Sequence, residues 1–80
     1  MAKANRPGYL SYRQFLVRLD QGWRVDPPIY IRSRWCSRSQ REETYHLILR
    51  NRGKTDLVSV DDSPEMRRFI AEQDLPLDRL

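Results

Sequence analysis

Four arginines fall within ten consecutive residues of this chain, in the segment RSRWCSRSQR at positions 32–41. The same segment holds three serines and one tryptophan. Guanidinium groups bind phosphate and carboxylate in a bidentate manner, and an aromatic ring beside them can stack on a nucleic-acid base. The segment therefore predicts contact with an anionic partner, either nucleic acid or an acidic protein surface.

The candidate nucleic-acid-binding residues supply positive charge and two stacking rings. They are Arg32, Arg34, Arg38, Arg41, Arg50, Arg52, Tyr30 and Trp35. Alternation along a strand places Arg32 and Arg34 on the same open sheet face as Tyr30, and the other arginines would extend this stripe along the next loop and strand. The alternative is a solvated face, on which long arginine stems cover apolar area and deter edge pairing.

Residues for catalysis or metal binding are scarce. His46 is the single histidine, so the sequence does not suggest a catalytic triad and cannot form a metal site with several histidines. The three glycines are isolated from one another and do not form a glycine-rich phosphate-binding loop. Asp61, Asp62 and Glu65 could hold a hard cation, but the start of a helix explains the same carboxylates. We expect no catalytic residue, no metal and no cofactor, and hence a protein that is not an enzyme.

Length and charge set the broad class. A chain of 80 residues has room for one hydrophobic core. Its net charge is +4, with the arginines concentrated in residues 1–52 and an acidic excess in residues 53–80. The single Cys36 cannot form an internal disulfide and is expected to be a small buried apolar residue. Neither a membrane span nor a signal peptide is recognisable, so a cytoplasmic protein without membrane contact is expected.

Two helices should flank the predicted strands. Ser11 and Gln14 make a capping box at the start of the first helix, and Gly22 closes that helix. Ser63 and Pro64 start the second helix, which should end near residue 74 because Pro76 disfavours helix before it.

Three strands are predicted between the helices, at residues 29–35, 44–50 and 55–60. Pro27 and Pro28 should lie at the entrance of the first strand or on a free edge. The sequence NRGK at positions 51–54 predicts a tight hairpin between the second and third strands.

The expected fold is α+β with the order α-β-β-β-α. It is a three-stranded antiparallel meander with both helices packed on one face. Residues 1–8 are expected to be a flexible arm, residues 9–77 a single α+β domain, and residues 78–80 a frayed C-terminus.

This order of elements resembles the topology of double-stranded RNA-binding domains, over residues 10–74. Those domains grip phosphates with a lysine-rich start of their second helix, whereas this chain has DDSPE at positions 61–65. Carboxylates there would repel the RNA backbone. The resemblance is therefore one of topology, it transfers no functional residue, and membership of that family is not expected.

Two functions compete on these observations. The first is a small binding module of unknown biological role, which contacts an anionic partner, with nucleic acid favoured, through the arginine-rich face and loop. The second is a protein–protein interaction domain or homodimer, because a small sheet leaves edges that a second copy can pair. Tyr9, Trp23 and Tyr30 would be the aromatic contacts in that case.

Overall fold

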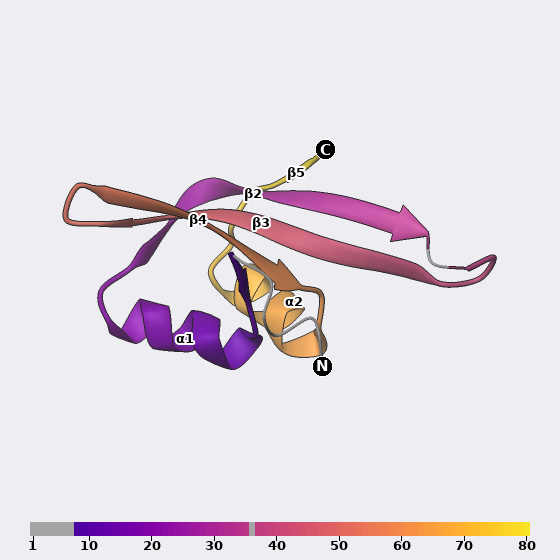
Figure 1. Cartoon of the computed structure of the whole chain (residues 1–80), viewed down its shortest axis with the longest axis horizontal. Helices are drawn as coiled ribbons and strands as arrows, with labels where there is room; N and C mark the ends of the chain where they lie inside the picture. Colours follow the sequence, from indigo (N-terminus) through magenta and orange to yellow (C-terminus); the bar gives the residue numbers. More distant parts are fainter. Residues whose placement is uncertain (1–7, 36) are drawn as a thin grey trace.

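A computed structural model of the chain describes residues 8–35 and 37–80. Residues 1–7 of the predicted arm, and Cys36, lie outside this range. The described elements form one mixed sheet with two helices on the same side of it (Figure 1), which confirms the α+β class. In chain order they are β1 (Tyr9–Leu10), α1 (Tyr12–Asp20), β2 (Arg24–Trp35), β3 (Arg41–Asn51), β4 (Lys54–Asp61), α2 (Pro64–Glu72) and β5 (Leu77–Arg79).

The sheet has five strands in the order β1-β4-β3-β2-β5, so the prediction of three strands was wrong. Strands β2, β3 and β4 pair antiparallel in sequence order. The two additional strands are short and parallel: β1 adds to β4, and β5 adds to β2. Strands of two and three residues are too short to show a periodic pattern, which is why the sequence did not reveal them.

The C-terminal residues, which we expected to fray, are hydrogen-bonded to the sheet. Strand β5 pairs with Ile29, Tyr30 and Ile31 of β2. The amide of Leu80 then donates to the carbonyl oxygen of Ile31 at 3.0 Å. All three residues of β5 are exposed. Their sequence, one apolar residue followed by two charged ones, does not show the alternation that indicates a half-buried strand.

Helix starts follow the capping signals in the sequence. The Ser11 hydroxyl accepts from the amide of Gln14 at 3.1 Å, and the Gln14 side chain accepts from the amide of Ser11 at 2.9 Å. Ser63 likewise accepts from the amide of Met66 at 3.0 Å, with Pro64 in the first turn. Both caps satisfy backbone donors that have no partner inside the helix.

Pro27 and Pro28 lie inside β2 rather than at its entrance, and the peptide bond between them is cis. The pairing with β3 shifts at this point: Asp26 faces Ile48, whereas Tyr30 faces His46. Three residues of β2 therefore oppose the single residue between Ile48 and His46. Such a bulge needs no ladder hydrogen bond from the prolines, which have no N–H to donate.

One face of the sheet forms the hydrophobic core with the two helices. Phe15 of α1 and Met66 of α2 are fully buried, and the rings of Phe15 and Phe69 meet edge to face at 5.1 Å between centroids. The buried strand residues alternate along β2, β3 and β4 as a half-buried sheet requires. They are Ile29, Ile31, Tyr45, Leu47, Leu49, Val58 and Val60.

Tyr45 connects this core to the start of α2. Its ring is buried, and its hydroxyl donates to the Asp62 carboxylate at 2.8 Å. Asp62 also pairs with Arg67 at 2.8 Å. Burial, and then the hydrogen bond to the negative carboxylate of Asp62, raise the pKa of Tyr45 well above its ordinary value.

Replacing Ser11 with alanine should lower the free energy of unfolding by about 1 kcal/mol, because an orphan amide of α1 loses its acceptor. Urea denaturation of both proteins measures this difference. Ser39→Ala, in the exposed connection between β2 and β3, is the matched control and should leave stability unchanged. Equal stability of the wild type and Ser11→Ala would show that the capping box contributes nothing.

The raised pKa of Tyr45 predicts a pH dependence of stability. The pKa of Tyr45 is higher in the folded state than in the unfolded chain, where tyrosine has a pKa of about 10. The contribution is therefore complete below about pH 10 and is lost as the pH rises above it. Denaturation from about pH 8 to about pH 11 should show a steeper loss of stability in the wild type than in Tyr45→Phe. Parallel losses would contradict this role of Tyr45.

Candidate functional site

Tyr30, Arg32 and Arg34 lie on the open face of β2, opposite the face that contributes to the core. Ile29 and Ile31 are buried on the helix side, so the intervening residues point the other way. Arg32 and Arg34 are exposed. Arg34 lies 3.6 Å from Glu42 on the neighbouring strand, which offsets part of its charge.

Trp35, Arg38 and Arg41 do not join this open face. Trp35 shares the helix side with Ile31 but lies beyond the helices, where it is 65% exposed. Arg41 is its partner across the strands, with the guanidinium 5.8 Å from the Trp35 ring centre and 3.4 Å from Glu43. Arg38 is exposed in the connection between β2 and β3.

Arg50 and Arg52 lie at the other end of the sheet. Arg32 pairs with Thr44 of β3, and Arg50 is six residues further along the same strand. At about 3.4 Å per residue, this separates the two groups by about 20 Å. The candidate residues therefore form two groups rather than the continuous stripe that the sequence suggested.

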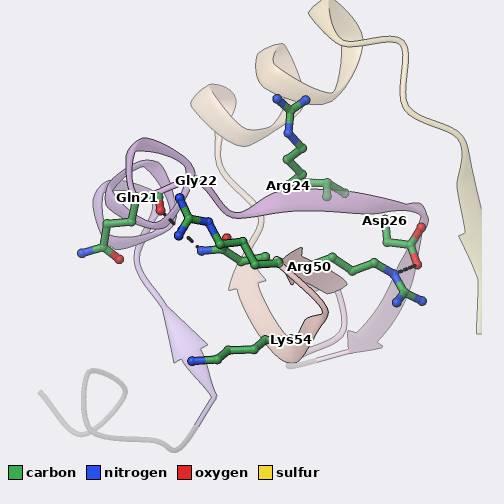
Figure 2. Close-up of a pocket in the computed structure, with 9 residues that line it drawn as sticks. Gln21, Gly22, Arg24, Asp26, Arg50 and Lys54 are labelled. Carbon is green, nitrogen blue, oxygen red and sulfur yellow. Dashed lines mark hydrogen bonds and ion pairs between the residues drawn. The ribbon is translucent and has the colours of Figure 1, made fainter.

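The basic group at the Arg50 end of the sheet contains more residues than the sequence analysis predicted. Four basic residues contribute to the lining of an open hollow beside the end of α1 and the turn between β3 and β4. In Figure 2 the side chains of Arg24, Arg50 and Lys54 extend in different directions, and that of Arg50 runs toward Asp26. We name the four basic residues the cationic end: Arg24, Arg50, Arg52 and Lys54.

Strand register assembles the cationic end. Arg24 at the start of β2 is the direct cross-strand partner of Arg50 on β3. Lys54 begins β4 opposite Asn51, and Arg52 lies in the intervening turn with a φ of 50°. The Asn51 side chain donates to the carbonyl oxygen of Gln21 at 3.4 Å, which joins the turn to the end of α1.

Positive charge at the cationic end is only partly compensated. Arg50 Nε donates to the Asp26 carboxylate at 2.7 Å. Arg24, Arg52 and Lys54 form no ion pair with any residue in the ranges 8–35 and 37–80. Arg24 and Arg50 are cross-strand partners, but their side chains diverge in Figure 2 and Arg50 turns to Asp26. The uncompensated positive charge at this end favours an anion near it.

Arg24 and Lys54 were missing from the sequence-based candidates. Lys54 could have been found, since the predicted hairpin at 51–54 already places it across the turn from Asn51. Arg24 could not, because Pro27 and Pro28 suggested that the strand begins after them. The bulge lets β2 start at Arg24 and run through both prolines.

Polar residues that suggested other chemistry have structural partners. The Nδ1 atom of His46 lies 2.8 Å from the Ser59 hydroxyl on the open face. Asp62 binds Tyr45 and Arg67, and Glu65 lies in the first turn of α2. Among the described residues, no three histidine, cysteine, aspartate or glutamate side chains gather as a metal site would need.

None of the helices in the described ranges combines the length and apolar composition needed to cross a membrane.

Known proteins add no family or function to this geometry. No family model, no curated protein and no solved structure matches the chain. Function must therefore be inferred from the positions and charges of the residues themselves.

Proposed function

We propose that this protein is a small, non-enzymatic binding module that contacts nucleic acid through its cationic end. One observation carries the proposal: four basic residues line one hollow, Asp26 is the one carboxylate among its described lining residues, and Asp26 pairs with Arg50. A phosphate at this hollow would neutralise charge that Arg24, Arg52 and Lys54 carry without an ion-pair partner among the described residues.

The chemistry of the side chains fits phosphate. Arginine presents a planar fork of donors that matches two phosphate oxygens, and lysine adds a mobile point charge. Asp26 binds the Nε atom of Arg50 and so orients the guanidinium, while the side chain remains 60% exposed to an incoming anion. The link between Asn51 and Gln21 positions the turn that holds Arg52.

The arginine-rich segment 32–41 is the weaker site for phosphate. Glu42 and Glu43 lie within ion-pair distance of Arg34 and Arg41. These are exposed pairs of modest strength, but they place negative charge where a phosphate would have to approach. The cationic end has fewer carboxylates for the same number of cations.

Replacing both Arg24 and Lys54 with alanine should weaken binding of a short fluorescent oligonucleotide by about tenfold. It should also flatten the salt dependence, because two fewer phosphate contacts reduce the slope of log K against log salt by about 1.4 for a single strand. Fluorescence anisotropy over about 50 to about 200 mM NaCl measures both quantities.

The matched control removes the same charge from the helix side. Arg13 and Arg68 are exposed on α1 and α2, and their double alanine variant should bind like the wild type. Equal weakening in both double variants would mean that net charge alone governs binding. Weakening in an Arg34→Ala/Arg38→Ala protein, with none at the cationic end, would move the site to segment 32–41. No binding by the wild type at the lowest salt would overturn the proposal and favour a protein partner.

A further inference from the structure

The open face of the sheet carries a row of rings across its strands. Tyr9 of β1 pairs with Ser59 of β4, Ser59 pairs with His46 of β3, and His46 pairs with Tyr30 of β2. Cross-strand partners share a face, so these four side chains lie side by side on the surface that the helices leave open. We name Tyr9, His46 and Tyr30 the aromatic row.

Apolar side chains widen this row. Ile48 and Leu57 are direct partners in the next position toward the cationic end, and the Leu57 side chain is 66% exposed. Tyr9, His46 and Tyr30 are each half-buried. The Ser59 hydroxyl lies 2.8 Å from His46 Nδ1 and fixes the orientation of that ring.

Cations flank the aromatic row along the strands. Arg32 is the next open-face residue after Tyr30 on β2, about 7 Å away at two residues' rise. In the other direction, Ile48 and then Arg50 follow His46 on β3, and Arg50 opens the cationic end. Rings lie at the centre of the face, with positive charge toward both ends of the strands. This pattern complements a chain that exposes flat bases and negative phosphates.

The width of the face favours unpaired bases over a duplex. Tyr9 and Tyr30 are three strand spacings apart, about 14 Å, which exceeds the width of about 12 Å of the DNA major groove. A paired base offers only its edge, because neighbouring bases cover its faces. An unpaired base offers a whole face for stacking on a ring.

We propose that the aromatic row binds the unpaired bases of single-stranded nucleic acid while the flanking cations hold its phosphates. This inference rests on the proposed function, and it names the class of nucleic acid that the module selects. The Trp35 ring lies on the opposite side of the sheet and plays no part in this binding.

The experiment compares three fluorescent probes of equal length: a single strand, its duplex, and an abasic strand that keeps the phosphates without the bases. The wild type should bind the single strand about tenfold more tightly than either other probe. Tyr30→Ala should abolish this preference and leave the abasic affinity unchanged. Tyr30→Phe, which retains the ring, should restore the preference.

Trp35→Ala is the matched control, since it removes an exposed ring from the other face and should keep the preference intact. Equal affinity of the wild type for the single and abasic strands would overturn the aromatic row alone, because phosphate binding would survive. Preference for the duplex would also overturn it. A dimer in sedimentation that Tyr30→Ala dissociates, with no preference for bases, would assign this face to a second copy. Failure of all three probes to bind would reject the proposed function itself.

Discussion

Packing of both helices against one face of the sheet is the constraint on which the other features depend. The contact between Phe15 and Phe69 brings the two helices together beneath β2, β3 and β4. In the middle of these strands, alternate residues are used in that core. The residues between them point to the open face, where contact with solvent or a partner, rather than core packing, constrains which side chains can be present.

That division explains why charge is distributed unevenly over the molecule. Carboxylates near the β2–β3 connection pair with Arg34 and Arg41, and Asp62 pairs with Arg67 at the start of α2. At the opposite end, the bulge at the prolines and the tight β3–β4 turn bring cations from separate segments together. Asp26 compensates one of them. Surplus positive charge thus arises from strand register rather than from a run of basic residues in the sequence.

Local signals in the sequence predicted the local structure well. Ser11, Gln14 and Ser63 mark the helix starts because a cap depends on residues only three positions apart. Strands β1 and β5 could not be predicted, because their pairing partners are distant in sequence and their lengths carry no period. The candidate site was partly predictable for the same reason. Tyr30 and Arg32 follow from alternation along one strand, whereas the Arg24–Arg50 pair requires knowing the register across the bulge.

The pairing of strand β2 with its neighbours changes along its length. At Tyr30 and Ile31 it is held by β3 on one side and by β5 and Leu80 on the other. From Arg32 to Trp35, β3 is its only ladder partner among the described strands, and this part of the hairpin extends past the helices in Figure 1. Its amide hydrogens should therefore exchange with deuterium through local opening, much faster than those between Ile29 and Ile31. Local opening of residues 32–35 would therefore leave the core intact, while the cationic end stays joined to α1 through Asn51 and Gln21.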